Sequence, residues 1–347
     1  MKSDEVTLAH GSGGRLMREL IEEIIVPIFD NPTLNRLDDA SLLELSSESE
    51  TGSESAPEPQ ALVMTTDSYV VKPPFFPGGD LGKLSVCGTV NDLATAGAIP
   101  LALSVGLIIE EGFLLADLKK ILISMKNTAD SIPIPIITGD TKVVERGRGD
   151  GLFVNTTGIG RVRAGVLLDS RRVRPGDAVL INGPVGNHEA SILCSRHEFS
   201  FNVDISSDCA PLHRLMQRVI DAVPDLKWAR DPTRGGVAAV LTELVETAGI
   251  RVVIDEEGIQ VEEEVQGICD ILGLDPLIMA NEGKMIVVVP GDKVSVCLEA
   301  MRSVPEGKDA RVIGVVQEGE PRLVMRTAYG TNRIITMPAG SQFPRIC

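Results

Sequence analysis

Aromatic residues and histidines are scarce in this sequence. Only 3% of the 347 residues are aromatic, and the four histidines are scattered without the spacing of metal ligands. The cores must therefore be aliphatic, and a metal centre built on His or Cys is disfavoured. Basic residues are also in deficit, since 33 Lys and Arg stand against 49 Asp and Glu, for a net charge of −16. This balance argues against nucleic acid or an anionic membrane as the main partner.

Long apolar runs and paired cysteines are missing as well. The first residues, MKSDEVTLAHGSGG, lack the apolar segment of a signal peptide. The most apolar stretch, residues 97–109, is interrupted by Pro100 and is too short to span a membrane. The six cysteines include no Cys-x-x-Cys pair, so disulfides are not expected in a reducing compartment. We therefore expect a cytoplasmic protein.

What the sequence does contain is typical of a mixed α/β protein. Short β-branched runs alternate with 34 glycines and 21 prolines, and the length suggests two domains. We expect an N-terminal domain over residues 1–164, a second α/β domain over 165–326 and a flexible tail over 327–347. Residues 41–60 are rich in Ser and acidic side chains, so we expect a mobile loop between two strands. An interaction segment is the alternative for that acidic run.

Apolar periodicity predicts the positions of the main elements. The expected helices cover residues 15–29, 80–97, 114–128 and 231–248, and the expected strands cover 61–66, 101–109, 134–138, 151–162, 251–255, 284–289 and 311–316. In the last of these helices, Asp231 is expected as the N-cap and Pro232 as the first helical residue.

Three acidic residues are expected where a strand ends or a helix begins: Asp67, Asp92 and Asp140. Carboxylates in such positions can converge on one edge of a sheet and hold Mg²⁺. Mg²⁺ in turn neutralises nucleotide phosphates, and Lys142 could supply a positive charge to a terminal phosphate. Each Asp by itself is more typical of a turn or an N-cap.

Two glycine-containing segments are further candidates. HGSGGR, at residues 10–15, precedes a helix, so the backbone N–H groups around Gly13 and Gly14 could bind phosphate. It lacks the Lys-Ser/Thr pair of a P-loop, and a flexible entry to the helix is the alternative. Glu282 in NEGK lies just before an apolar strand and could act as a general base if burial raises its pKa. An exposed Glu in a turn is the plainer interpretation.

The chain ends in the residues PRIC, with Cys347 last. A prenylation signal is excluded, because it requires cysteine four residues from the end and Pro344 stands there. The α-carboxylate beside the thiol disfavours the thiolate, and Arg345 partly offsets this effect. A thiol on a loose arm is suited to carrying a group between two places. A chance terminal cysteine is the alternative.

The order and spacing of several motifs resemble the HypE family of hydrogenase maturation proteins, over residues 6–347. The motifs are HGSGGR, TTDS, VNDLATAGAIP, ITGDTKVV, GIG, PGDAVLINGPVG, DPTRGG, NEGK and the terminal PRIC. The wider superfamily is that of aminoimidazole ribonucleotide synthetase, which implies two α/β domains with mixed sheets. Two features depart from the family pattern: residues 186–189 are GNHE rather than having an acidic residue before the His and Gly after it, and the acidic insert is long.

The resemblance implies a particular activity. A partner carbamoyltransferase would load a carbamoyl group onto Cys347, and ATP-dependent dehydration would convert it to a thiocyanate. The cyanide would pass to the iron of a [NiFe] hydrogenase through an iron-carrying assembly complex. The family also implies a homodimer formed by the N-terminal domains, with ATP near that interface, seated in part by Asn91 and the loop that carries Gly13 and Gly14.

The same resemblance assigns roles to the acidic residues. Asp67, Asp92 and Asp140 would hold Mg²⁺, and Lys142 would lie near the γ-phosphate. Glu282 would take protons from the amide nitrogen as phosphate departs.

Two other classes of protein remain compatible with these residues. A superfamily enzyme that acts on a free small molecule would keep its activity without the tail. A non-catalytic scaffold for metallocentre assembly would not turn over ATP even when the tail is carbamoylated.

Overall fold

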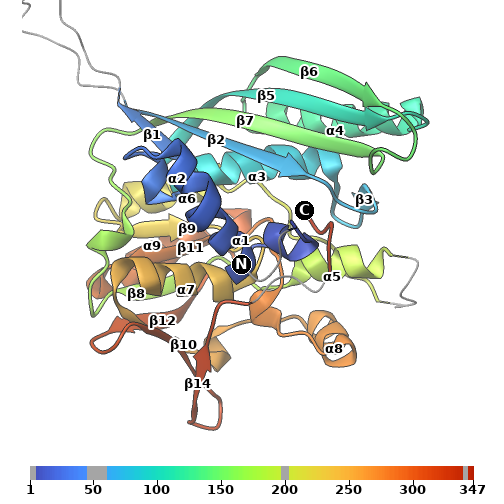
Figure 1. The fold of residues 1–347 in the computed structure, drawn as a ribbon. Helices are drawn as coiled ribbons and strands as arrows, with labels where there is room; N and C mark the ends of the chain where they lie inside the picture. Colours follow the sequence, from blue (N-terminus) through green and yellow to red (C-terminus); the bar gives the residue numbers. More distant parts are fainter. Residues whose placement is uncertain (1–4, 45–60, 197–202, 339–342) are drawn as a thin grey trace, which may run out of the picture.

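The computed structural model describes residues 5–44, 61–196, 203–338 and 343–347. Within these ranges the chain forms two large sheets, one above the other in Figure 1, with helices packed between and around them. A five-stranded sheet uses residues 41–162, and a seven-stranded sheet uses residues 178–335. The predicted limits of the two domains stay a prediction.

The five-stranded sheet has the order β1-β2-β7-β5-β6. Only β5 and β6 pair in parallel; the other neighbours are antiparallel. Its strands are β1 (Ser41–Glu44), β2 (Ala61–Tyr69), β5 (Ala98–Glu110), β6 (Ile136–Val144) and β7 (Leu152–Val162), and a short ribbon is formed by β3 (Phe75–Phe76) and β4 (Gly79–Asp80).

Two helices pack on one face of this sheet, α3 (Leu81–Thr95) and α4 (Leu115–Ser131). α3 begins at Asp80, whose carboxylate accepts hydrogen bonds from the backbone of Gly82 and Lys83. Nearly all of α3 is buried because it lies between the sheet and the second half of the chain (Figure 1). The other face of the sheet carries exposed apolar side chains.

The seven-stranded sheet has the order β14-β13-β10-β12-β8-β11-β9 and is covered on both faces. One face packs against α7 and the other against α6 and α9, which explains why β11 is apolar throughout. Its strands are β8 (Ala178–Ile181), β9 (Trp228–Arg230), β10 (Arg251–Asp255), β11 (Ile286–Val289), β12 (Arg311–Gln317), β13 (Arg322–Arg326) and β14 (Asn332–Ile335), and the helices are α5 (Asn187–Cys194), α6 (His213–Ala222), α7 (Gly236–Ala248), α8 (Glu263–Leu272) and α9 (Val294–Arg302).

Two predicted strands are longer than expected, and this moves two of the candidate aspartates. β2 runs on to Tyr69 and β6 to Val144, so Asp67 and Asp140 lie within strands rather than at their ends. Asp92 likewise lies inside α3. The extra residues include Thr, Val and Tyr, which favour strands, and they outweigh the turn preference of a single Gly or Asp.

The start of the predicted helix 231–248 is wrong. α7 begins at Gly236, five residues later than expected, so Asp231 is not its N-cap and Pro232 is not its first residue. The reason is that Gly235, the residue before the helix, adopts a φ of 80°, a left-handed conformation that a regular helix does not admit. The residues of DPTRGG before Gly236 therefore form a loop, and their side chains are not arranged along a face of α7.

The N-terminal helix is confirmed as a continuous helical stretch. It consists of α1 (Arg15–Leu20), one π-helical turn and α2 (Val26–Phe29). The expected mobile loop at 41–60 begins too early, because β1 pairs with β2; its remainder, residues 45–60, lies outside the described residues. Within the expected tail, β14 pairs with β13. No described helix is long and apolar enough to cross a membrane.

Candidate active site

A cavity of about 190 Å³ lies where the two halves of the chain meet, and the last residue of the chain is part of its wall. Its lining combines Thr, Ser and Tyr hydroxyls with an unusual set of charged groups. Those groups are the carboxylates of Asp39, Asp67, Asp92, Asp231 and Glu282, the guanidinium of Arg234 and the thiol of Cys347. Among the described lining residues, the guanidinium is the one cation, so the cavity has a strong excess of negative charge.

Three of these carboxylates form a tight cluster. The oxygens of Asp39, Asp92 and Asp231 all lie within 4.8 Å of one another. Burial, and then the charges of neighbouring aspartates, raises the pKa of both Asp92 and Asp231 well above the ordinary range. Arg230 pairs with Asp39 at 2.6 Å, and the Thr65 hydroxyl donates to Asp92 at 2.7 Å. Such a cluster requires bound protons or a cation.

Each aspartate of the cluster comes from a different element. Asp39 precedes β1, Asp92 lies in the buried part of α3, and Asp231 follows β9 in the DPTRGG loop. Asp67 adds a fourth carboxylate from β2, where it accepts a hydrogen bond from the Tyr69 hydroxyl at 2.9 Å. Of the three aspartates predicted to act together, Asp67 and Asp92 therefore share the cavity.

Asp140 and Lys142 do not join them within one chain. Asp67 pairs across the sheet with Thr156, whose hydroxyl bonds to α3, so the side chain of Asp67 lies on the helix-covered face. Asp140 lies on the edge strand β6 and pairs with Gly106 of β5, so its side chain is on the opposite face of the sheet. Three strand spacings, about 14 Å, also separate β2 from β6. Within a single chain, Asp67, Asp92 and Asp140 therefore do not come together at one edge of the sheet as the sequence predicted.

Cys347 and Glu282 face each other in the cavity. Burial, followed by the charge of Glu282, raises the pKa of the Cys347 thiol, so the docked cysteine is a thiol rather than a thiolate. Burial also raises the pKa of Glu282 well above its usual range. Glu282 is only 3% exposed. A carboxyl group in this state can exchange a proton with a group attached to the neighbouring sulfur.

The loop that carries Glu282 is fixed from two sides. The amide of Asn91 on α3 donates to the backbone oxygens of Ala210 and Glu282, and its oxygen accepts from the backbone of Leu212. Asp208 accepts hydrogen bonds from the backbone N–H groups of Glu282 and Gly283. Asn91 is 1% exposed and its polar atoms are all engaged, so it is positioned to hold the loop.

A second cavity, of about 520 Å³, adjoins the first and shares with it Asp39, Asp231 and Arg234. Gly13 and Gly14, from the N-terminal loop, form part of its wall. Gly13 has φ +74°, and a Cβ there would overlap the backbone of Arg234. Glycine is therefore required for the close contact between the N-terminal loop and the DPTRGG loop.

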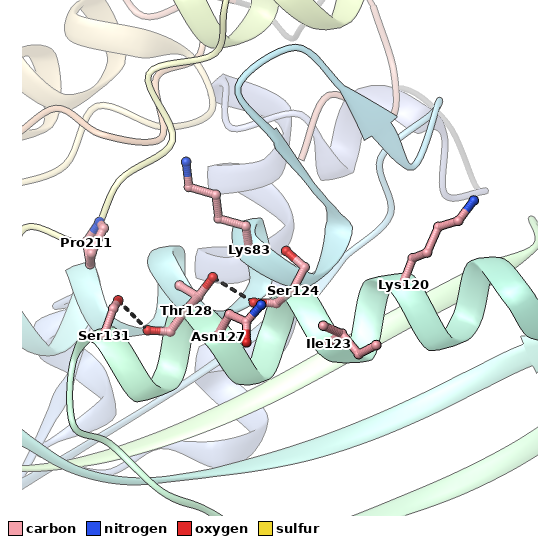
Figure 2. A pocket seen from close by; sticks show the side chains of 8 residues that line it. All are labelled: Lys83, Lys120, Ile123, Ser124, Asn127, Thr128, Ser131 and Pro211. Carbon is pink, nitrogen blue, oxygen red and sulfur yellow. Dashed lines mark hydrogen bonds between the residues drawn. The ribbon is translucent and has the colours of Figure 1, made fainter.

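Figure 2 shows a third hollow, an open groove of about 480 Å³ along α4. Its polar side chains are largely engaged locally, since the hydroxyls of Thr128 and Ser131 donate to carbonyls of α4 itself. Lys83 donates to the carbonyl of Gly78 and Lys120 pairs with Asp117. This groove has no cluster of reactive groups, and we place the active site at the two adjoining cavities.

Several site residues escaped the sequence reasoning. Asp39 stands in an Asp-Asp-Ala segment directly before a strand, and this acidic pair is the sequence feature that could have indicated a site residue. Asp231 and Arg234 stand in DPTRGG, where two glycines before a helix indicated a special loop. His188 is buried in α5, within the GNHE segment that departs from the family pattern.

The comparisons with known proteins first define a class. Residues 37–162 match the N-terminal domain, and residues 174–326 the C-terminal domain, of AIR synthase related proteins. A thiamine monophosphate kinase from Aquifex aeolicus has the same fold at 17% identity, with a TM-score of 0.61 over 92% of this chain and 99% of that one. The two-domain α/β fold predicted from the sequence is thereby confirmed.

Closer relatives then identify the family. The carbamoyl dehydratase HypE of Rhodobacter capsulatus is 48% identical over 100% of this chain and 99% of its own length. A crystal structure of HypE in complex with ATP covers 99% of this chain and 100% of that one, at 41% identity and a TM-score of 0.80. A HypE–HypF complex gives 0.84 at 44% identity, over 92% and 99% of the two chains. The chain belongs to the HypE family of carbamoyl dehydratases, which are hydrogenase maturation proteins.

Proposed function

We propose that this chain carries a carbamoyl group on the sulfur of Cys347 and dehydrates it to a thiocyanate at the expense of ATP. The observation that carries the proposal is the docking of Cys347 in a cavity opposite Glu282 and beside the aspartate cluster. A freely diffusing substrate would not require the last residue of the chain there. The activity named for the HypE relatives supports the same conclusion.

In this reaction the carbamoyl oxygen is transferred from carbon to the γ-phosphorus of ATP. The carbamoyl oxygen attacks the γ-phosphorus of ATP, the bond from that phosphorus to the β,γ-bridging oxygen breaks, and ADP leaves. The oxygen then departs from carbon as inorganic phosphate, while the nitrogen loses both of its protons and the C≡N bond is completed. In its ionised form Glu282 is placed to accept one of these protons, because it is buried and directed at the terminal sulfur, and it passes that proton on before it takes the second.

The cluster of Asp39, Asp92 and Asp231 fits Mg²⁺. Its donors are carboxylate oxygens within 4.8 Å of one another, which is the ligand type that Mg²⁺ selects, and their mutual repulsion favours a bound cation. Asp67 lines the same cavity and belongs to the proposed set. Mg²⁺ bound there would supply charge neutralisation for the phosphates.

The second cavity is the proposed seat of the nucleotide. It adjoins the aspartate cluster, so a nucleoside bound there would direct its phosphates toward the cation and toward Cys347. The backbone around Gly13 and Gly14 forms part of its wall. A HypE structure in complex with ATP, at 41% identity, supports the binding of ATP by this chain.

Asp140 and Lys142 are proposed to act in the site of a second copy. They lie exposed on the uncovered face of the N-terminal sheet, together with exposed apolar side chains such as Ile108, Met64 and Ile159. Pairing this face with the same face of another chain would bury those side chains. It would also place Lys142, which a single chain keeps away from the proposed nucleotide site, at the interface between the two copies.

The proposed partners follow from the reaction. A carbamoyltransferase must load the tail, and the HypE–HypF complex among the related structures supports such a contact. An iron-carrying hydrogenase assembly complex would receive the cyanide. The described cysteines are all free thiols, and the reaction needs a reduced Cys347, which supports a cytoplasmic location.

The test is mass spectrometry of the C-terminal peptide after incubation with the carbamoyltransferase, carbamoyl phosphate and Mg-ATP. We expect Cys347 to gain a carbamoyl group and then to lose one water in an ATP-dependent step. Glu282→Gln should accept the carbamoyl group but dehydrate it at least about 100-fold more slowly, because the proton acceptor is gone. Cys347→Ala should remain unmodified.

Other outcomes would favour the competing classes. If the tail stays unmodified while ATP is consumed with a free substrate, the protein is another kind of superfamily enzyme. If the tail is carbamoylated but no ATP is consumed, the protein is a carrier or scaffold without the dehydratase step.

A further inference from the structure

The last residues of the chain are held by side chains that lie outside the reaction cavity. Arg196 donates from Nη2 to the main-chain oxygens of Pro344 and Arg345, at 2.6 and 3.2 Å. His188 contacts the next oxygen, since its Nε2 lies 2.9 Å from the carbonyl of Ile346. Three consecutive carbonyls before the terminal cysteine are therefore bound by two side chains of α5 and the turn that follows it. The path of the C-terminal segment beside α5 is visible in Figure 1.

The contact from His188 has a defined direction. A carbonyl only accepts, so Nε2 carries the hydrogen, and Nδ1 accepts from the Ser207 hydroxyl at 2.8 Å. The ring is fully buried and meets Phe76 edge-on, with 5.5 Å between centroids. Burial lowers the pKa of His188, which keeps it neutral and in this tautomer at pH 7. The imidazole is thus a fixed donor directed at the tail.

Arg196 belongs to a second network around the same segment. Its Nε donates to the carbonyl of Lys72 at 3.2 Å, and the backbone N–H of Lys72 donates to the carbonyl of Arg345 at 3.2 Å. The Arg345 side chain pairs with Asp150 at 2.6 Å, and Asp150 also pairs with Lys72 at 3.3 Å. The tail is consequently attached to the N-terminal sheet as well as to α5.

This attachment determines where the terminal thiol lies. The side chain of Ile346 is only 5% exposed and packs into the core beneath α3. Arg345 is held at φ +61°, a conformation that a residue with a Cβ rarely adopts without external restraint. Because the tail is anchored on both sides of that bend, Cys347 is held in the cavity that Glu282 lines.

We propose that His188 and Arg196 form a tail clamp, a pair of positioning residues that hold the backbone of the tail so that Cys347 meets Glu282. This inference rests on the proposed function, because it assigns the clamp to the dehydration step. The clamp binds main-chain oxygens, so it holds the tail whichever group the sulfur carries. It must open before the sulfur can reach a partner protein.

The experiment measures docking and chemistry separately. Docking is followed by the rate at which iodoacetamide alkylates Cys347 in the protein alone, mapped on the C-terminal peptide. Chemistry is followed by the rate of ATP-dependent water loss from the carbamoylated tail. We expect Arg196→Ala to speed alkylation about tenfold and to slow water loss by a similar factor, because a charge-assisted donor to two carbonyls is lost. The KM for ATP should not change.

Three further variants keep the test decisive. His188→Gln retains an N–H donor and is expected to behave nearly like the wild type, whereas His188→Ala should behave like Arg196→Ala if it folds. Arg214→Ala is the matched control, since Arg214 also donates to a main-chain carbonyl, that of Ser131, but lies away from the tail. Near-identical alkylation rates in Arg196→Ala and the wild type would overturn the clamp. Because alkylation needs neither ATP nor a partner, that result is separate from any failure of the proposed dehydration.

Discussion

Three carboxylates within 4.8 Å of one another, from Asp39, Asp92 and Asp231, oppose the folding of the metal-free protein. Burial and mutual repulsion raise the pKa of Asp92 and of Asp231, so ionising them in the folded state costs free energy that the unfolded chain does not pay. A site of this kind lowers the stability of the metal-free protein and allows it to bind a cation. Removing one carboxylate should therefore affect stability and function in opposite directions.

Asp231→Asn tests this exchange. At pH 7 we expect the metal-free variant to be more stable than the metal-free wild type. Its free energy of unfolding should be higher by about 1 kcal/mol or more, because a buried negative charge is removed. Added Mg²⁺ should stabilise the wild type but not the variant, and ATP-dependent dehydration should be lost. Urea denaturation with and without Mg²⁺ measures both effects. Asp130→Asn, on an exposed part of α4, is the control and should change neither.

At the scale of elements, α5 supports the active site through consecutive residues. His188 holds the tail, and Glu189 accepts a hydrogen bond from the backbone N–H of Ala280 at 2.8 Å. That bond supports the loop that leads to Glu282. α5 begins after Gly186, which adopts φ +89° in close contact with Met279, so the helix and the loop are packed directly together.

Glu189→Gln should make stability less dependent on pH. Burial raises the pKa of Glu189 from 4.5 to about 7, so the folded state retains a proton that the unfolded state releases. The wild type therefore loses stability as pH rises from about 4.5 to 7, and the full cost of about 3 kcal/mol is present above pH 7. Urea denaturation from pH 5 to 8 should give a difference between variant and wild type that grows with pH. A constant difference would contradict the buried-carboxyl assignment.

At the scale of the whole molecule, no described residues outside the N-terminal sheet cover one of its faces. Ile108 on that face is 45% exposed and lies directly opposite Lys142 on the neighbouring strand. Exposed apolar side chains on a flat sheet are typical of an interface. The same face carries Asp140, which a single chain keeps away from the aspartate cluster.

Ile108→Glu should convert a dimer to monomers and abolish ATP-dependent dehydration. A charge in the middle of a paired apolar face is costly, but it is harmless on a surface that faces water. Light scattering coupled to gel filtration measures the mass. Leu115→Glu, at an 81% exposed position on α4, is the control and should leave mass and activity unchanged.

Complementation then tests the shared site. Asp67→Asn and Asp140→Asn should each be inactive alone, whereas their mixture should recover about a quarter of the wild-type rate, because half of the dimers contain one intact site of two. No recovery on mixing would mean that Asp140 serves the chain on which it lies.

The sequence by itself determined the elements and the kind of chemistry. Alternating β-branched residues predict β2 and β7, the apolar spacing predicts α3 and α4, and an ordered set of motifs ending in Cys347 indicates the HypE family. These are local properties, set by side-chain periodicity and by the conformational limits of Gly and Pro. Where two local preferences competed, as at Asp67 and Asp140, the boundary was misplaced, because strand propensity and turn propensity differ by less than the tertiary contacts contribute.

Only the tertiary structure decided which residues meet. Asp39 and Asp231 are remote in sequence and come together because β9 and the segment before β1 pack at the same place. Asp67 and Asp140 look equivalent in sequence, yet the alternation of side chains along paired strands sends them to opposite faces of one sheet. Convergence of this kind depends on register and on packing between distant segments, and neither is encoded in the periodicity of any one of them.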